Sequence, residues 1–351
     1  MKPKIYILIL NWNGWKDTLE CLESVFRLKY DSFQVIVCDN ASQDNSLERI
    51  CAWAAGDETA KTEEHSPLAH MTRPPVNKPI SFEFYNRHQA ETLTETTDAP
   101  LILIQTGDNL GFAGGNNVGM RYILQMGDAE YVWLLNNDTV IDPMCLDHML
   151  ESVSIHEKPA ICGSRVLFYY EPEIIQALGG AEYNKWTGLA KSIGLGIPAD
   201  KKIKPKQYES RLSYIVGASW LLPVRYLRDI GLMEEAYFLY YEEIDWCIRG
   251  AEKYDLCYSD KALVYHKEGK SIGSSSDKRK TSLLSDFYLF RNKLVFTWKY
   301  YPEALISVYA TTFLQALNRI RRGQWDKAAL IFSIMLGKKK FENQSSARNN
   351  S

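Results

Sequence analysis

The sequence has few of the features that would assign it at once to a common class of protein. Its seven cysteines are scattered, odd in number and without a Cys-x-x-Cys pair. This usage argues against a zinc ribbon or a disulfide framework, and it favours a reducing cytoplasm. A formal charge of −2 gives no argument for a nucleic-acid partner. The apolar run Ile5–Leu10 is too short for a membrane span, and no small-residue cleavage site follows it.

What the sequence does contain fits a large globular protein. A chain of 351 residues, 46% hydrophobic and 24% charged, can hold one large domain with an appendage. Apolar runs alternate with stretches of helical spacing, which predicts an α/β fold with a mostly parallel sheet and helices on both faces. The predicted strands are Ile5–Leu10, Gln34–Cys38, Leu101–Ile104 and Tyr131–Leu135, and the predicted helices are Trp15–Leu28, Leu47–Ala55 and Val118–Met126.

Two segments depart from this alternation. Residues 56–100 are rich in Thr, Glu, Pro and His, which predicts an inserted, partly flexible excursion with one extra strand near Ile80–Tyr85. From residue 283 onward, helical segments lead to a polar tail. We therefore expect a main domain over residues 1–282 and a C-terminal helical extension over residues 283–351.

Polar residues follow the predicted strands, at the edge where parallel sheets bind their ligands. Asn11 and Asn13 follow the first strand, and Asp39 opens a polar segment after the second. An acid at such a strand end can accept the N–H of a pyrimidine or bind ribose hydroxyls. The alternative is an ordinary Asx turn that caps the next helix.

Two further motifs lie at predicted strand ends. Asn136–Asp138 closes an apolar strand, and its oxygen atoms suit a hard divalent ion, with His266 as a second ligand, although a lone histidine is more often structural. The glycine-rich segment Asn109–Asn117 predicts a turn, either plain or allowing close approach to a nucleotide. It has neither GxGxxG spacing nor a Walker lysine.

The segment Tyr237–Arg249 carries the strongest catalytic signal. It sets Glu242, Glu243 and Asp245 among aromatic and aliphatic residues. Such surroundings raise the pKa of a carboxyl group and can make it a general base. The alternative is the start of an amphipathic helix, where acids favour the positive end of the helix dipole.

The order of the motifs along the chain is more specific than any one of them. Asn-Trp-Asn-Gly, Asp-Asn-Ala-Ser-x-Asp, Asn-Leu-Gly-Phe-Ala-Gly-Gly-Asn, Leu-Leu-Asn-Asn-Asp, Val-Gly-Ala-Ser, Tyr-Tyr-Glu-Glu-x-Asp-Trp-Cys-x-Arg and Tyr-His-Lys follow one another. This series resembles the family 2 glycosyltransferases with a GT-A fold, especially the rhamnosyltransferase-like branch of bacterial polysaccharide assembly. The resemblance covers about residues 4–300, interrupted by the excursion at residues 56–100.

The resemblance implies a GT-A fold and an inverting enzyme. It would move a sugar, rhamnose in the resembling branch, from a nucleotide-diphosphate sugar to a hydroxyl of a glycan or lipid-linked glycan, with Mg²⁺ or Mn²⁺. The implied nucleotide-sugar-binding residues are Asn11, Asn13, Asp39, Asn109, Gly111, Asn116, Asn137 and Arg291. The implied metal ligands are Asp138, Asn136 and His266, and the implied catalytic residues are Glu243 as the base, Glu242 and Asp245.

This chain departs from the family pattern at two of these positions. Asn136 stands at the first position of an Asp-x-Asp metal motif, and Glu243 stands where the branch usually carries Asp. The resemblance agrees with elementary chemistry, because a leaving diphosphate needs charge neutralisation and an acceptor hydroxyl needs a base. One base without an enzyme nucleophile implies a single displacement with inversion.

Three other classes compete with this interpretation. An NAD-dependent oxidoreductase would carry the glycine fingerprint and a ribose-binding acid at its usual distance, which this chain lacks. A nucleotidyltransferase of similar fold would show a basic glycine-rich phosphate loop near the N-terminus, and Asn11–Lys16 does not look like one. A nucleotide-sugar-binding protein without catalysis would not need Glu243.

The C-terminal extension contains two apolar stretches, Ala304–Leu317 and Trp325–Leu336, each shorter than the roughly 20 residues of a spanning helix. Basic residues border them, notably Arg321, Arg322 and Lys338–Lys340. This pattern is typical of helices lying on an anionic cytoplasmic leaflet. We therefore expect a cytoplasmic protein, peripheral at the inner face of the membrane. Packing on the main domain or a homodimer contact is the alternative.

Overall fold

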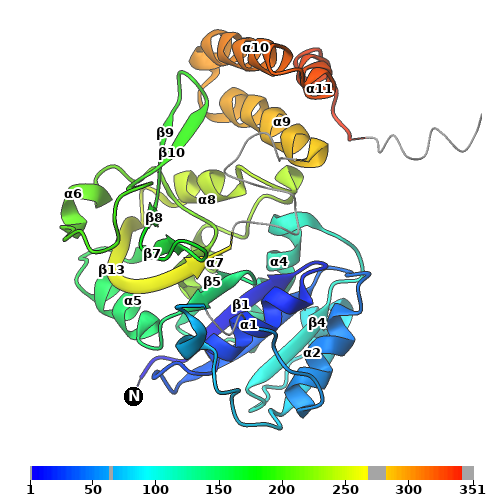
Figure 1. Cartoon of the computed structure of the whole chain (residues 1–351), viewed down its shortest axis with the longest axis vertical. Coiled ribbons are helices and arrows are strands. Elements are labelled where there is room, and N and C mark those ends of the chain that lie inside the picture. Colours follow the sequence, from blue (N-terminus) through cyan, green and yellow to red (C-terminus); the bar gives the residue numbers. More distant parts are fainter. Residues whose placement is uncertain (1, 63–65, 268–281, 342–351) are drawn as a thin grey trace, which may run out of the picture. The chain divides into compact units, whose positions relative to one another are not determined.

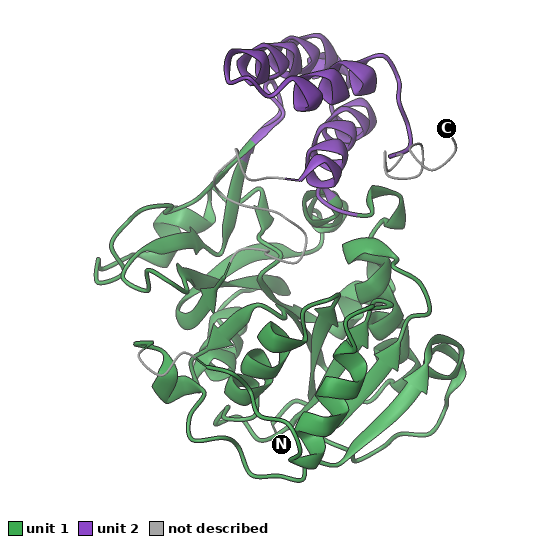
Figure 2. Ribbon diagram, turned by 45° about the vertical axis from the view of Figure 1, so that its right-hand side comes forward, with its two compact units in different colours: residues 1–182, 190–238, 242–271 green, residues 183–189, 239–241, 272–351 purple. Residues whose placement is uncertain are grey.

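The computed structural model describes residues 2–62, 66–267 and 282–341. The chain forms two compact units (Figure 2). Unit 1 comprises residues 1–182, 190–238 and 242–271, and unit 2 comprises residues 183–189, 239–241 and 272–351. All seven cysteines lie in the described residues and are free thiols.

The predicted alternation of strands and helices is confirmed (Figure 1). The strands are β1 (Ile5–Asn11), β2 (Phe33–Asp39), β3 (Phe82–Asn86), β4 (Leu101–Gln105), β5 (Tyr131–Asn136), β6 (Thr139–Ile141), β7 (Ala160–Phe168), β8 (Ile175–Leu178), β9 (Gly180–Asn184), β10 (Leu189–Ser192), β11 (Tyr214–Ile215), β12 (Ser219–Pro223) and β13 (Asp255–His266). The α-helices are α1 (Trp15–Val25), α2 (Ser46–Ala55), α3 (Arg87–Thr92), α4 (Gly111–Met126), α5 (Cys145–Ser154), α6 (Pro205–Glu209), α7 (Val224–Asp229), α8 (Glu242–Gly250), α9 (Leu283–Tyr300), α10 (Leu305–Arg321) and α11 (Trp325–Met335).

The main sheet of unit 1 has the strand order β3-β4-β2-β1-β5-β12-β7-β13-β6, and β8 pairs with β7. Strands β3, β4, β2, β1 and β5 run parallel, with Asn11 opposite Asp39 and Asp39 opposite Gln105. Strand β12 is antiparallel to β5 and β7, and β6 is antiparallel to β13. The sheet is therefore mostly parallel, as predicted, and the parallel strands bring their carboxyl ends to one edge.

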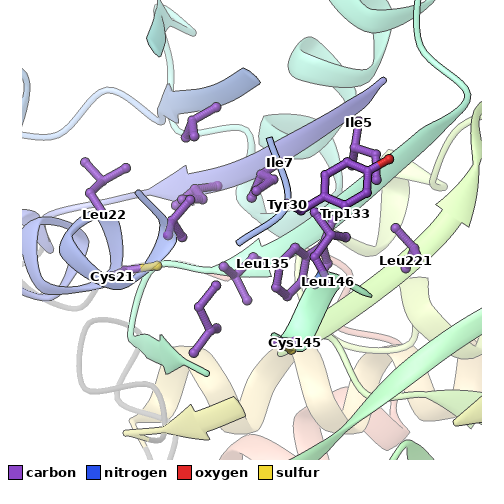
Figure 3. Close-up of a cluster of buried hydrophobic side chains, with 14 of the residues drawn as sticks. Ile5, Ile7, Cys21, Leu22, Tyr30, Trp133, Leu135, Cys145, Leu146 and Leu221 are labelled. Atoms are coloured by element: carbon purple, nitrogen blue, oxygen red, sulfur yellow. The ribbon is translucent and has the colours of Figure 1, made fainter. Parts of the chain in front are cut away.

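Alternate residues of each central strand pack against different helices, because successive strand side chains point to opposite faces. Ile5 and Ile7 of β1 join a core with α1, α2 and α5. Figure 3 shows part of this core. Tyr6 and Leu8 join a second core with α4, α7 and α8. Central strands that are apolar on both faces explain why the sequence shows continuous apolar runs.

The predicted excursion at residues 56–100 contributes to the sheet. Its strand β3 pairs in parallel with β4 at the edge of the sheet, and the short helix α3 follows directly. Asn86 caps α3 by accepting a hydrogen bond from the Gln89 backbone N–H at 2.9 Å, and the Gln89 side chain accepts one from the Asn86 N–H. This capping box explains why a short helix starts at this point.

The predicted turn at Asn109–Asn117 is wrong over most of its length, because α4 already begins at Gly111. Its glycines allow the helix to lie close to the sheet. A Cβ atom at Gly115 would lie 2.5 Å from Leu10 Cδ1, and one at Gly119 would lie 2.3 Å from Leu8 Cδ1. Glycine is less favourable than alanine in a helix by about 1 kcal/mol. The close contact with the sheet therefore explains why α4 includes these glycines.

Unit 2 holds α9, α10 and α11, whose own core contains Phe287, Phe290, Val308 and Ile331. Three charged side chains, Asp286, Lys293 and Arg319, are also buried there. None of the helices in the described ranges is both long enough and apolar enough to cross a bilayer.

The close approach of α4 to β1 predicts the effect of Gly119→Ala. Overpacking a core costs roughly 1–3 kcal/mol, and alanine regains up to about 1 kcal/mol of helix propensity. Leu8 is fully buried and has little room to move. We therefore expect a net loss of about 1–2 kcal/mol in the free energy of unfolding of unit 1, measured by urea denaturation.

The matched control shortens the opposing side chain. Leu8→Val lacks the Cδ1 atom that the new Cβ would meet, so the pair Leu8→Val with Gly119→Ala should lose less stability than the sum of the single changes. Additive losses would show that the overlap at Gly119 does not limit packing.

Candidate active site

The carboxyl ends of β1, β2 and β4 meet at Asp39. Its Oδ1 accepts a hydrogen bond from Asn11 Nδ2 at 2.7 Å, and its Oδ2 accepts one from Gln105 Nε2 at 3.0 Å and one from the Ser42 N–H at 3.1 Å. Asn11 and Asp39 are almost fully buried. Amide donors offset the cost of burying a carboxylate, so Asp39 is held in one orientation. We call Asn11, Asp39, Ser42 and Gln105 the Asp39 corner.

Asn13 ties the loop after β1 to the loop after β2. Its backbone N–H donates to Ser42 Oγ at 2.8 Å, and its Oδ1 accepts from the Gln43 N–H at 2.7 Å. The backbone of Asn13 is left-handed, with φ of 51°, a conformation that asparagine tolerates better than most residues. Asn13 therefore links the two loops beside Asp39.

The three other residues predicted from the glycine-rich segment have different places. Asn109 is exposed, and its Oδ1 accepts a hydrogen bond from Asn40 Nδ2 at 3.0 Å. Gly111 has φ of +71°, and a Cβ atom there would lie 2.3 Å from the carbonyl oxygen of Phe238. Asn116 is buried in α4 and donates to the Phe112 carbonyl at 2.9 Å. Asn116 therefore contributes to the helix itself.

Two of the predicted metal ligands, Asp138 and His266, lie together. His266 Nε2 is 3.2 Å from Asp138 Oδ1, and His266 Nδ1 is 2.9 Å from Gln176 Oε1. Both side chains are largely buried, and they come from the loop after β5 and the end of β13. Asn136 ends β5 and is partly buried. The Asn137 side chain instead faces β1 and α1, since its Nδ2 donates to Thr18 Oγ1 at 3.0 Å and to Asn11 Oδ1 at 3.3 Å.

Lys267 anchors the backbone beside Asp138. Its N–H donates to the Asp138 carbonyl at 3.0 Å, and its Nζ pairs with Asp17 at 2.7 Å and with Glu20. Burial lowers the pKa of this ammonium group, but Glu20 and Asp17 raise it further, so the net pKa is above the usual range. Lys267 therefore stays charged. The Tyr-His-Lys motif did not indicate that this lysine anchors the backbone beside Asp138.

The donor set of this pair suits a divalent ion that keeps other ligands. A carboxylate oxygen and an imidazole nitrogen lie within 3.2 Å of each other. Among the residues described, no group of three or more His, Cys, Asp or Glu is placed to hold a metal ion. Mg²⁺ and Mn²⁺ commonly combine one or two protein ligands with waters and substrate phosphates, so the residues present fit such an ion.

Glu243 is linked to the Asn136 motif through two consecutive residues. A Cβ atom at Gly217 would lie 2.3 Å from Glu243 Oε1, so only glycine leaves room for this carboxylate. The next residue, Ala218, accepts a hydrogen bond from the Asn136 N–H at 3.1 Å. The segment Gly217–Ala218 thus joins the first turn of α8 to the end of β5. Gly217 lies in the Val-Gly-Ala-Ser motif, yet its contact could not be read from sequence.

Burial raises the pKa of Glu243 to about 7, and a hydrogen bond from the Gly217 backbone N–H lowers it in part. The side chain keeps some exposure, because Glu243 is only partly buried. A carboxyl group with a pKa near neutrality is suited to accept a proton at physiological pH.

The neighbouring acids of α8 differ from Glu243. Asp245 is fully buried, with Oδ1 2.8 Å from Arg249 Nε and Oδ2 3.2 Å from Tyr237 Oη. Arg249 also donates to the carbonyls of Ile230 and Leu232. Asp245 therefore holds Arg249 against the backbone of residues 230–232, and its catalytic role stays a prediction. Glu242 is 3% exposed, which leaves Glu243 as the accessible acid of the three.

The backbone before α8 is strained. Phe238, Tyr240 and Tyr241 all have positive φ, between 63° and 75°, which aromatic residues rarely adopt. The Phe238 carbonyl accepts a hydrogen bond from the Phe112 N–H at 2.7 Å, which fixes this turn to the start of α4. Strain of this kind is often found at functional sites.

The predicted ligand Arg291 lies in α9, in unit 2, whereas the other predicted site residues belong to unit 1. Its Nη1 donates to Asn292 Oδ1 at 2.6 Å, and Asn292 Nδ2 donates to the carbonyls of Leu239 and Tyr240. The Arg-Asn pair therefore holds the short segment of unit 2 that precedes α8.

Comparison with known proteins finds similarity in the N-terminal part of the chain. Residues 6–65 match the model of glycosyl transferase family 2. The similarity to this family is therefore carried by the segment from β1 to the start of the excursion. The low-salt glycan biosynthesis hexosyltransferase Agl10 of Haloferax volcanii is 31% identical over 153 residues, which cover 42% of this chain and 45% of that protein. The chain thus matches less than half the length of this relative.

Solved structures agree on the fold. GalNAc-T7, solved with UDP, GalNAc and Mn²⁺, has a TM-score of 0.51 at 12% identity, over 83% of this chain and 51% of that one. The mannosyltransferase PcManGT of Pyrobaculum calidifontis, solved with GDP-Man and Mn²⁺, has a TM-score of 0.50 at 11% identity, over 96% of this chain and 87% of that one. These likenesses confirm the predicted GT-A type of α/β fold.

The raised pKa of Glu243 predicts how stability depends on pH. The folded state holds a proton that the unfolded state releases above its ordinary pKa of 4.5. The stability that Glu243 contributes is therefore complete below pH 4.5 and is lost as pH rises through about 7. At pH 8, Glu243→Gln should therefore raise the free energy of unfolding by up to roughly 3 kcal/mol, which a higher melting temperature would show. This gain should vanish toward pH 5.

The control is Glu157→Gln, at an exposed position after α5. It should change the melting temperature little at either pH. An equal gain from Glu243→Gln at pH 5 and pH 8 would mean that packing, and not the buried charge, causes the effect.

Proposed function

We propose that this protein is an inverting glycosyltransferase that moves a sugar from a nucleotide-diphosphate sugar to a hydroxyl group of a glycan or lipid-linked glycan. The observation that carries the proposal is the Gly217–Ala218 segment, which joins the Glu243 carboxylate to the Asn136–Asp138 loop. A candidate base and a candidate metal ligand are thus held by one short segment at the ligand-binding edge of the sheet.

The comparisons support the reaction class. The matched family model describes glycosyl transferases, and the Haloferax relative is named a hexosyltransferase of glycan biosynthesis. We keep rhamnose as a proposal for the sugar, on the motif order alone. We also propose residues 1–282 as the catalytic domain and residues 283–351 as the helical extension.

The Asp39 corner is the proposed site for the nucleoside. The hydrogen bond from Asn11 Nδ2 to Asp39 Oδ1 fixes both side chains, so they need no further ordering on binding. Asn13, Asn109, Gly111 and Asn116 would shape the surrounding loops and the start of α4. Because Asn137 reaches Asn11, its proposed role is to support this corner and not to bind the donor directly.

Asp138 and His266 are the proposed protein ligands of a Mg²⁺ or Mn²⁺ ion, with the Asn136 side chain nearby in sequence. When bound, such an ion neutralises the negative charge that develops on the leaving diphosphate. Lys267 and the Gln176 contact of His266 would hold the two ligands in position, which commonly strengthens metal binding.

Glu243 is the proposed general base. The acceptor oxygen forms a bond to the anomeric carbon while the bond from that carbon to the diphosphate oxygen breaks, and the acceptor proton passes to Glu243. A single displacement inverts the anomeric carbon. With a pKa of about 7, Glu243 is largely ionised only above neutrality, so turnover should fall as pH drops below about 7.

The decisive experiment screens the purified protein against a panel of nucleotide sugars with glycan and lipid-linked glycan acceptors. Glu243→Gln keeps the shape of the side chain but cannot accept the proton. We expect turnover to fall by about 10²–10⁴ while binding of the donor, measured by calorimetry, is retained. A protein that binds a nucleotide sugar but transfers no sugar would favour the alternative of a binding protein. Release of pyrophosphate in a parallel assay with nucleoside triphosphates and sugar 1-phosphates would favour a nucleotidyltransferase.

Two controls separate the base from its surroundings. Glu242→Gln should reduce turnover much less than Glu243→Gln, and the opposite order would assign the base to Glu242. Gly217→Ala should impair turnover by crowding Glu243, and combining it with Glu243→Asp should impair turnover less than additively, because the shorter acid leaves room for the new Cβ atom.

The metal proposal makes a separate prediction. Asp138→Ala should lower turnover by orders of magnitude and weaken Mn²⁺ binding, measured by calorimetry without donor. Asp142→Ala, after β6 and outside this pair, is the matched control and should leave Mn²⁺ binding unchanged. Full activity in excess EDTA would contradict the metal proposal while leaving the glycosyltransferase proposal standing.

A further inference from the structure

Helix α10 turns its large apolar side chains outward. Ile306, Tyr309, Phe313, Leu314 and Leu317 are exposed, with Ile306 at 87% and Leu314 at 64%. Their spacing of three and four residues puts them on one stripe of the helix. This stripe, which we call the α10 stripe, is the side that a helix of a water-soluble protein normally buries.

The inward side of α10 is comparatively polar. Thr312 and Arg319 are buried with Val308 and Ala316. Arg319 pairs with Asp286 of α9 at 3.4 Å, and Lys293 Nζ of α9 contacts Thr312 and Gln315. Arg319 has a charged partner and Lys293 has hydrogen-bond acceptors on α10, so polar contacts within unit 2 favour this orientation of the helix.

The outward orientation has a cost in water. Burying one large apolar side chain is worth roughly 1.5–3 kcal/mol, and the α10 stripe forgoes much of this for five of them. An exposed apolar patch of this kind on a folded protein indicates a partner. The stripe therefore needs an apolar surface that unit 2 does not itself supply in the described residues.

The apolar surface continues onto α11. Phe332 of α11 packs against Phe313 with ring centroids 5.8 Å apart, so the two helices lie side by side at the stripe. Trp325 opens α11 with 65% of its surface exposed, and Leu336 follows it at 90%. Tryptophan next to an apolar face is typical of segments that lie at a membrane–water interface.

The charge of this region identifies the kind of partner. Residues 283–341 contain ten Lys and Arg but three Asp and Glu, in a chain whose formal charge is −2. Arg321 and Arg322 are exposed at the end of α10, and Lys339 and Lys340 are exposed after α11. A second copy would bring two such positive regions together. An anionic bilayer complements both the apolar stripe and the basic ends.

We propose that the α10 stripe, with Trp325 and Leu336 of α11, inserts into the headgroup region of an anionic lipid bilayer, and that Arg321, Arg322, Lys339 and Lys340 bind its anionic headgroups. The helices lie along the surface, because α10 has 17 residues and no helix in the described part of the chain can span a bilayer. The proposal is independent of the transferase activity.

The test is sedimentation of the full-length protein with vesicles of phosphatidylcholine alone or with added phosphatidylglycerol. We expect binding to the anionic vesicles, weakened at least tenfold by Ile306→Ser with Leu314→Ser. The matched control is Ile155→Ser with Leu195→Ser in unit 1, two apolar residues that are 74% and 52% exposed, and it should bind as the natural protein does. Circular dichroism checks that both variants fold.

A second pair of variants separates the charges from the apolar stripe. Arg321→Gln with Arg322→Gln should weaken binding and reduce its dependence on salt, because fewer headgroup contacts remain to be screened. Equal binding by the Ile306 and Leu314 variant, or equal binding to neutral and anionic vesicles, would overturn the proposal. So would a protein that dimerises through the stripe and does not bind vesicles, as light scattering would detect.

Discussion

The register of the parallel strands is the constraint on which the candidate site depends. Asn11, Asp39 and Gln105 are opposite one another on β1, β2 and β4, so the sheet itself places their side chains in a row. Burying the Asp39 carboxylate alone would cost several kcal/mol, and the donors from its neighbours offset that cost. A shift of one residue in β2 would turn Asp39 to the other face and leave the amides without this acceptor. The same contacts therefore stabilise the register and define the corner.

Pairing of the antiparallel strand β12 positions the rest of the candidate site. It pairs with β5, and the residues just before it connect Asn136 to Glu243 through Gly217 and Ala218. Space is the limiting quantity, because a single methyl group at Gly217 would overlap the carboxylate. Burial raises the pKa of Glu243, and the hydrogen bond from the Gly217 N–H lowers it in part. Glu243 is longer by one methylene than the Asp of the resembling branch, and glycine at position 217 provides the room for it.

Much of this arrangement could be predicted from the sequence, because alternating apolar and helical patterns and polar strand ends are local signals. Asp39, Asp138 and His266 were singled out in this way, and the structure brings Asp138 and His266 together. Signals that depend on distant contacts were missed or misread. The glycines of α4 resembled a turn until their contact with β1 was known, and Gln105 matters only because β4 lies beside β2. Asp245 was singled out because its neighbours are aromatic, and its contacts with Arg249 and Tyr237 could be placed only with the fold.

The two units bury charge in ways that suit different surroundings. In unit 1, the buried acid Asp39 is satisfied at the end of a strand and Asp245 by Arg249 within α8, while helices cover the apolar faces of the sheet. In unit 2, buried charges on α9 and α10 turn the apolar side of α10 outward, so its stability in water is lower than its composition allows. A bilayer would reverse that balance without any change in the fold. A lipid-linked acceptor would then share the same surface as the enzyme, and confinement to a surface raises effective concentration without a new contact at the active site. The specificity of the sheet and the location set by the helices can therefore change independently.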